Sequence, residues 1–102
     1  MPTISVLYPR SDDATFDFDY YERVHLPLVA ERWKDGGLTK VEALRGIAVD
    51  GEPPFMAIAL ISFDTMESLA AAANGPHMAE IGADLANFTN VRPIRQVNAA
   101  IG

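Results

Sequence analysis

The stretch F-M-A-I-A-L-I-S-F, residues 55–63, decides the fold of this 102-residue chain. Its apolar side chains follow one another without alternation, and a strand with that pattern is buried on both faces. A Gly- and Pro-containing turn signal precedes it at 50–54, and a helix start follows at 64–67. We therefore predict a central strand of a sheet at 55–63.

The segments on either side of this strand predict a β-α-β-β-α-β order. Asp17 is a suitable N-cap for the first helix, and Gly36 and Gly37 form its stop signal. Asp64 and Glu67 are spaced as a capping box that opens the second helix. The predicted strands are 3–9, 38–49, 55–63 and 91–99, and the predicted helices are 17–34 and 64–74, with an extra helical segment at 76–90. This order is that of a ferredoxin-like α+β fold with an antiparallel sheet, in a single domain spanning residues 1–102.

Both helices of such a fold lie on one face of the sheet, which leaves the other face uncovered. The strand at 55–63 nevertheless carries large apolar side chains on both faces, and a large exposed apolar patch is unusual in a monomer. A second copy of the same sheet, packed back to back, is the simplest cover. We therefore expect a homodimer formed through the open sheet face.

Composition and charge exclude several classes of function. Eight Lys and Arg against fourteen Asp and Glu give a net charge of −6, whereas nucleic-acid binding needs clustered basic residues. The N-terminus has no signal-peptide pattern, and the apolar run 55–61 is far shorter than the roughly 20 residues that cross a bilayer. We expect a cytoplasmic protein that binds neither nucleic acid nor membrane.

Motifs for cofactors and metals are also lacking. The chain has no cysteine, no G-x-G-x-x-G, no Walker loop and no G-x-S-x-G elbow. Its two histidines, His25 and His77, form no H-x-H or H-x-x-x-H pair. We therefore expect neither a cofactor nor a metal ion in the site.

The first predicted helix carries the most specific pattern in the chain. The run F-D-F-D-Y-Y at 16–21, followed by H-L-P-L-V at 25–29, Trp33 and G-L at 37–38, resembles the signature of EthD-like proteins. The later D-L-A-N-F at 84–88 resembles another part of that family. The resemblance implies a dimeric α+β barrel, in which two ferredoxin-like protomers face each other through their sheets.

The resemblance also implies a range of functions. The family's namesake accompanies a cytochrome monooxygenase system that degrades ethyl tert-butyl ether. Relatives with the same barrel include monooxygenases, polyketide cyclases, isomerases and decarboxylases. Because one fold hosts so many reactions, the fold by itself does not select one.

His25 is the leading candidate for catalysis. Tyr21, Leu28 and Val29 lie on the same side of the predicted helix, so the imidazole is expected to face the sheet. A neutral imidazole there can take or give a proton near pH 7. Pro27 cannot donate a helical hydrogen bond, so we expect a kink that opens space beside His25. The alternative is a structural histidine bonded to the backbone.

The other candidates bind or orient a substrate. Tyr21 lies one turn before His25 and is predicted to orient a substrate oxygen or the imidazole as a second catalytic residue. Asp84 is predicted to pair with a histidine and fix its tautomer. The predicted substrate-binding residues are Tyr8, Trp33, Arg45, His77 and Asp84. Each also has an ordinary structural explanation, which is core packing for the aromatic residues and an ion pair or a surface position for the others.

Three hypotheses about function follow. The first is an enzyme of a degradation or oxidation pathway that acts on a small hydrophobic oxygenated or aromatic metabolite. Its general acid/base is His25, and isomerisation, cyclisation, decarboxylation and cofactor-free oxygenation all fit. The second is a non-catalytic accessory dimer that holds such a metabolite for a partner oxygenase. The third is a dimer whose apolar groove is only core. A cavity with converging polar groups supports the first two over the third.

Overall fold

Four strands form one antiparallel sheet in the computed structural model, which describes residues 1–102. The strands are β1 (Thr3–Pro9), β2 (Leu38–Arg45), β3 (Phe55–Phe63) and β4 (Ile94–Asn98). They lie in the order β2-β3-β1-β4, and every neighbouring pair is antiparallel. The predicted ferredoxin-like α+β fold is confirmed, and β3 is one of the two central strands.

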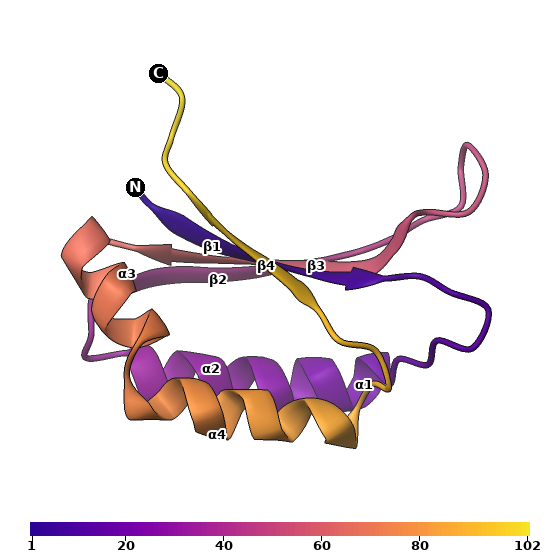
Figure 1. The fold of residues 1–102 in the computed structure, drawn as a ribbon, viewed down its shortest axis with the longest axis horizontal. Coiled ribbons are helices and arrows are strands. Elements are labelled where there is room, and N and C mark those ends of the chain that lie inside the picture. Colours follow the sequence, from indigo (N-terminus) through magenta and orange to yellow (C-terminus); the bar gives the residue numbers. More distant parts are fainter.

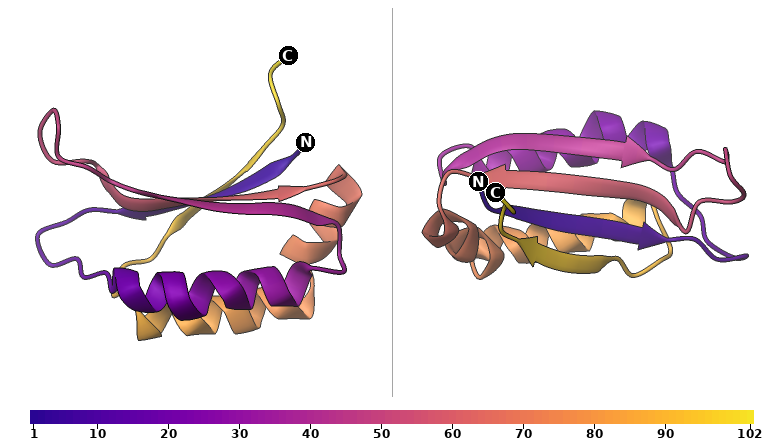
Figure 2. Two further views of the ribbon diagram at one scale, coloured as in Figure 1. Left: turned by 180° about the vertical axis from the view of Figure 1, so that it is seen from behind. Right: turned by 90° about the horizontal axis from the view of Figure 1, so that it is seen from above.

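All helices lie on one face of the sheet or at its end, and the other face carries none (Figures 1 and 2). The first helical stretch consists of α1 (Phe18–Tyr20), a π-helical segment (Tyr21–His25) and α2 (Leu26–Trp33). After β3 come α3 (Met66–Ala73), α4 (Pro76–Asp84) and a 3₁₀ turn (Leu85–Asn87).

The helix that lies beside α2 under the sheet is α4, whereas α3 lies at the end of the sheet (Figures 1 and 2). The expectation that the helix at 64–74 is the second main helix is therefore wrong. Both helices contribute to the main core, α3 with Leu69 and Ala72 and α4 with Ile81. What joins α4 to the first helical stretch are side-chain pairs across the helix layer, His25–Asp84 and Arg32–Glu80.

Thr65, rather than Asp64, caps α3. The Thr65 hydroxyl oxygen accepts a hydrogen bond from the Ser68 backbone N–H at 3.1 Å. The backbone N–H of Asp64 instead donates to the Gly37 carbonyl at 2.8 Å. The expected capping box of Asp64 and Glu67 is wrong because the backbone of Asp64 is still held next to β2, and the helix begins one residue later.

Two strands are shorter than expected. β2 ends at Arg45, and although the Gly46 N–H still donates to the Met56 carbonyl at 2.9 Å, the chain then leaves the sheet. β4 begins at Ile94, directly after Pro93, because a proline has no N–H to donate to the neighbouring strand. Both differences lie at the ends of strands and leave the topology unchanged.

β3 presents apolar side chains to both faces of the sheet, as its sequence predicts. Ala59, Ile61 and Phe63 alternate along the helix-covered face and are buried. Ile58 and Leu60 point to the open face and are only partly buried. The helices therefore account for the apolar side chains on one face of β3. The apolar side chains on its other face have no cover within the chain.

The strand register aligns four apolar residues across the open face. Ile58 lies opposite both Leu7 on β1 and Leu44 on β2, and Leu7 in turn lies opposite Ile94 on β4. Leu44 and Ile94 are about half exposed, at 49% and 53%. We call these four residues the apolar row.

Candidate functional site

An apolar cavity of about 240 Å³ lies between the helices and the sheet. Of the 17 residues that line it, 13 are hydrophobic. Four of the predicted site residues are among them, namely Tyr8, Tyr21, His25 and Trp33. A cavity of roughly 150 Å³ already holds benzene, so this one has room for a substituted ring.

The π-helical segment positions Tyr21 and His25 in the cavity wall. Because Pro27 has no N–H, the turn before it cannot complete the regular α-helical pattern. The Leu26 N–H donates to the Tyr21 carbonyl, five residues back. In this wider turn the Tyr21 ring stacks on the His25 imidazole, with ring centroids 5.4 Å apart and planes 18° from parallel. The irregularity expected at Pro27 therefore takes the form of a π-helical turn, a feature that often marks functional sites.

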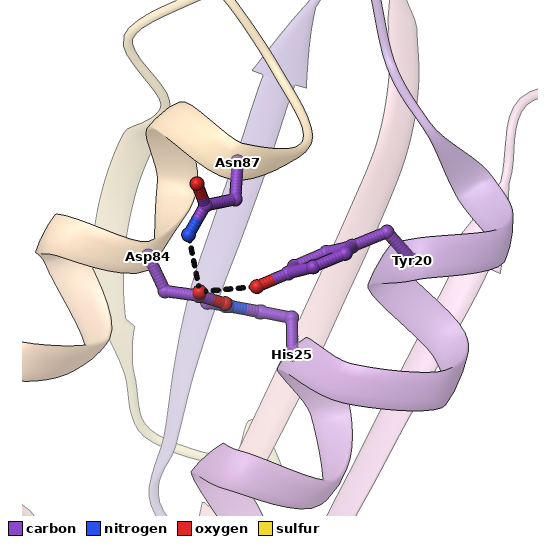
Figure 3. Close-up of polar contacts among 4 residues, drawn as sticks. All are labelled: Tyr20, His25, Asp84 and Asn87. Atoms are coloured by element: carbon purple, nitrogen blue, oxygen red, sulfur yellow. Dashed lines mark hydrogen bonds and ion pairs between the residues drawn. The ribbon is translucent and has the colours of Figure 1, made fainter.

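Asp84, at the end of α4, holds the imidazole from across the helix layer (Figure 3). Its Oδ2 lies 2.8 Å from His25 Nδ1. Its Oδ1 accepts hydrogen bonds from the Tyr20 hydroxyl at 2.6 Å and from Asn87 Nδ2 at 3.0 Å. Both side chains of the central pair are largely buried, with 5% of His25 and 12% of Asp84 exposed. The carboxylate is thus fixed by two further residues and in turn fixes the imidazole.

The electrostatics of this pair favour a neutral imidazole beside a carboxylate. Burial lowers the pKa of His25, and the hydrogen bond and charge of Asp84 offset this only in part. Burial alone would raise the pKa of Asp84, but hydrogen bonds from Tyr20, Asn87 and His25 outweigh it, so this pKa lies below its ordinary value. At neutral pH the carboxylate accepts a hydrogen bond from the protonated Nδ1 of His25, which leaves Nε2 of the neutral ring unprotonated.

Nε2 of His25 makes no hydrogen bond, and the residue lines the cavity. The only side-chain hydrogen bond of the ring is that of Nδ1, yet the chain contains no buried side-chain nitrogen or oxygen without a partner. Nε2 therefore keeps accessible surface, and the cavity is what His25 lines. A bound ligand would meet a basic nitrogen that is held in place by a carboxylate.

Aromatic rings surround the rest of this end of the cavity. The Phe88 ring lies 4.6 Å from the imidazole, and the Tyr8 ring lies 5.8 Å from that of Tyr21. Burial raises the pKa of Tyr21 to about 12, and burial together with the nearby Tyr21 raises the pKa of Tyr8 well above its ordinary value. Both hydroxyls stay protonated at neutral pH, and because one of them donates to the other, one proton of the pair remains for a substrate oxygen.

Trp33 lies in the part of the cavity wall that belongs to the main core. Its ring packs edge-on against Phe63, with centroids 5.8 Å apart. Three predicted substrate-binding residues lie outside the cavity lining, namely Arg45, His77 and Asp84, the last of which contacts the lining residue His25. The Arg45 guanidinium lies over the Phe18 ring, 4.0 Å from its centroid. His77 is exposed at the start of α4, with Nδ1 3.9 Å from Glu80 Oε1.

Sequence reasoning missed Asn87, Phe88 and Arg95. Asn87 and Phe88 stand in the D-L-A-N-F stretch, and a spacing of three on a helix already places Asn87 beside Asp84. Arg95 lines the cavity from β4. Alternation along that strand, which puts Arg95 on the same face as Pro93, was the signal that could have found it.

The chain offers an acid–base pair rather than a ligand set for a metal ion, because no three His, Asp or Glu side chains gather in one place. None of its helices is long and apolar enough to cross a membrane.

Residues 9–92 match the EthD domain. The chain belongs to the EthD family. The matched stretch contains the whole His25–Asp84 pair with Tyr20 and Asn87, and it stops just short of β4, so Arg95 lies outside it.

Solved structures agree with this assignment. An EthD-like protein from Ralstonia eutropha JMP134 is 31% identical, with a TM-score of 0.85 over 95% of this chain and 88% of that chain. An EthD family protein from Bacillus halodurans C-125 is 22% identical, with a TM-score of 0.69 and 99% of both chains covered. SnoaB, a cofactor-independent oxygenase from Streptomyces nogalater, shares the fold at 14% identity, with a TM-score of 0.61 over 99% of this chain and 92% of that chain. Among curated proteins, none matches the chain.

Proposed function

We propose that this EthD-family protein binds a small hydrophobic, oxygenated or aromatic metabolite in its cavity and moves a proton on it, with His25 as general acid/base. The observation that carries the proposal is that the two nitrogens of one imidazole differ: Nδ1 is bound to Asp84, while Nε2 is free at the cavity. A purely structural histidine would use both nitrogens within the fold.

The chemistry that fits this arrangement is proton abstraction next to a carbonyl or from a phenol. Nε2 takes the proton as the substrate C–H or O–H bond breaks, and the electron pair stays on the substrate as an enolate or phenolate. Asp84 stabilises the imidazolium that forms, and the hydrogen-bonded hydroxyls of Tyr8 and Tyr21 together supply one donor to the developing oxyanion. Isomerisation, cyclisation and cofactor-free oxygenation all begin with such an anion, and the description of SnoaB as a cofactor-independent oxygenase supports this class.

The apolar walls support a second function. With 13 hydrophobic residues among the 17 that line it, the cavity can hold a metabolite without changing it. In this function the protein is an accessory dimer that presents the metabolite to a partner oxygenase, and His25 Nε2 only accepts a hydrogen bond from the ligand.

Deuterium uptake from solvent separates the two functions. 2-Indanone is a small ring-fused ketone with acidic C–H bonds next to its carbonyl, and its exchange in D₂O is followed by NMR. We expect the protein to accelerate the exchange and His25→Asn to reduce this acceleration by about 10²–10⁴-fold. His77→Asn is the matched control and should leave it unchanged. Binding of 2-indanone with exchange at the buffer rate would end the catalytic function and leave the accessory function.

The same proposal includes a homodimer formed through the open face of the sheet. The apolar row crosses all four strands on a face that no helix covers. Leu60, on the same face of β3, extends it. Packing of two such faces removes this apolar surface from water, which is the main source of free energy in association.

The mass in solution tests the dimer. Light scattering at micromolar concentration should give twice the 11.1 kDa of one chain. Ile58→Asp should dissociate the dimer, because it would bury an unpaired charge at a cost of several kcal/mol. Val49→Asp, in an exposed loop, is the control and should stay dimeric. A wild-type mass near that of one chain over the whole range would contradict the proposal.

A further inference from the structure

The cavity has one fixed charge, and the proton-transfer site does not use it. Arg95 on β4 lies opposite Val6 on β1, so both side chains lie on the helix-covered face, and both line the cavity. No aspartate or glutamate is among the lining residues. The other titratable groups there are Tyr8, Tyr21 and His25, which are neutral at pH 7 in the arrangement described above.

Arg95 also lacks a carboxylate partner. Five of the chain's eight Lys and Arg residues form ion pairs with Asp or Glu, and Arg95 is not among them. Its one side-chain contact is Nη1 to the sulfur of Met78, at 3.2 Å, and a thioether is a weak acceptor. A guanidinium has five donors in a planar fork that matches a carboxylate. In a chain with fourteen acidic residues, such an unpaired fork at a cavity is available for an acid that comes from outside.

The two polar ends of the cavity lie at different heights along α4. Arg95 contacts Met78 in the first half of α4, whereas His25 is held by Asp84 at its end. These two positions are six residues apart, a rise of about 9 Å along the helix. A single ring with a carboxylate on one side and a reacting oxygen or carbon on the other has suitable dimensions to contact both ends, with the apolar walls against its faces.

Resting on the proposed function, we propose that the substrate is a small ring-containing carboxylic acid and that Arg95 binds its carboxylate while His25 acts at the opposite end. Arg95 is then the residue that determines specificity for acids over neutral compounds. Arg95 is exposed in the free protein, so water solvates the guanidinium until an acid takes its place.

Benzoate and benzamide form the test pair, because they have nearly the same shape and differ in charge. Trp33, the chain's single tryptophan, lines the cavity, so its fluorescence reports binding, and calorimetry gives the affinity independently. We expect benzoate to bind about 10–100-fold more tightly than benzamide, the usual contribution of a hydrogen bond to a charged group. Arg95→Gln should abolish this preference by weakening benzoate alone, and Arg95→Lys should retain part of it.

Arg92→Gln is the matched control, since Arg92 is exposed and does not line the cavity, and it should preserve the preference. Thermal unfolding of each variant establishes that the fold is intact. Equal binding of the two probes to the wild-type protein would overturn the role of Arg95 and leave the proposed function standing. Retention of the full preference by Arg95→Gln would have the same meaning. Failure of both probes to bind would overturn the assignment, and 2-indanone exchange would then decide the proposed function by itself.

Discussion

Two pairs of a basic and an acidic side chain link the first helical stretch to α4, and they differ in what surrounds them. Arg32 donates to both carboxylate oxygens of Glu80, at 2.8 and 2.9 Å, and these side chains are 37% and 45% exposed. His25 and Asp84 meet at the same 2.8 Å distance but are 5% and 12% exposed. Glu80 and Asp84 are one turn apart on α4, so the same helix face presents both carboxylates.

The comparison shows that placement, rather than pairing, gives the His25–Asp84 pair its chemistry. Water screens the outer pair of Arg32 and Glu80, and both groups keep their ordinary charges there. At the inner pair, burial lowers the pKa of His25, while the hydrogen bonds to Asp84 keep the carboxylate ionised. Of the inner pair, His25 also lines the cavity. A neutral base beside a ligand site is therefore the product of burial combined with a well-bonded carboxylate.

The two pairs should differ most when the carboxylate of each is neutralised in turn. Asp84→Asn should reduce the 2-indanone exchange rate by about 10- to 1000-fold, because an amide no longer fixes the Nδ1–H tautomer or stabilises the imidazolium. The ¹⁵N shifts of His25 should show a change of tautomer. Glu80→Gln should alter neither the rate nor the shifts. A rate loss in Asp84→Asn with the tautomer unchanged would contradict the positioning role of Asp84.

The inner pair should also contribute more than the outer pair to the free energy of unfolding. This difference should be smaller than the difference in exchange rate. His25→Ala removes a buried partner of Asp84 and enlarges the cavity, and we expect a loss of roughly 1–3 kcal/mol in the free energy of unfolding. Arg32→Ala breaks an exposed pair and should cost much less. Urea unfolding of both variants at pH 7.5 measures the difference. A larger loss for Arg32→Ala would show that the outer pair holds α2 and α4 together.

The sequence predicted the fold because the decisive signals are local. The unbroken apolar run of β3 marks a central strand, and Gly36 and Gly37 mark the end of the first helix. The choice of α4 over α3 as the partner of α2 was not predictable in this way, because it depends on contacts between residues far apart in the sequence, such as Arg32 and Glu80. The strand ends at Arg45 and Ile94 depend on hairpin and proline geometry, which the apolar pattern does not record.

The site was predictable where helix spacing applies and not where it depends on register. Tyr21 and His25, four residues apart, do lie together in the cavity wall, and Asp84 does pair with a histidine. Arg45 was expected beside the substrate, yet the register places it opposite Ala57, over Phe18. Arg95 takes a place in the cavity lining instead. Both edge strands border the cavity, β2 through Val41 and β4 through Arg95, so which arginine reaches it depends on its position along the strand, and the apolar pattern does not record where the cavity ends.

The smallest effect expected is the pH dependence of stability, and it distinguishes the two pairs by the pH range in which stability is lost. The pKa of His25 is lower in the folded protein than its ordinary value of 6.5. As the pH falls below about 6.5, the unfolded chain therefore binds a proton before the folded one does, and the free energy of unfolding decreases. The pKa of Asp84 is also lowered, from 3.8, so its contribution is lost only in a second step as the pH falls through about 4 and below.

Urea unfolding of the wild-type protein and of His25→Asn between pH 7.5 and 3 tests this order. The variant should lack the first decrease, which begins near pH 6.5, and keep the second, because Asp84 still accepts hydrogen bonds from Tyr20 and Asn87. Arg32→Ala should show both decreases, since the outer pair contains no histidine. Parallel curves for the wild-type protein and His25→Asn between pH 6.5 and 5 would mean that the pKa of His25 is not lowered by folding. The neutral base on which the proposed proton transfer depends would then have no physical cause.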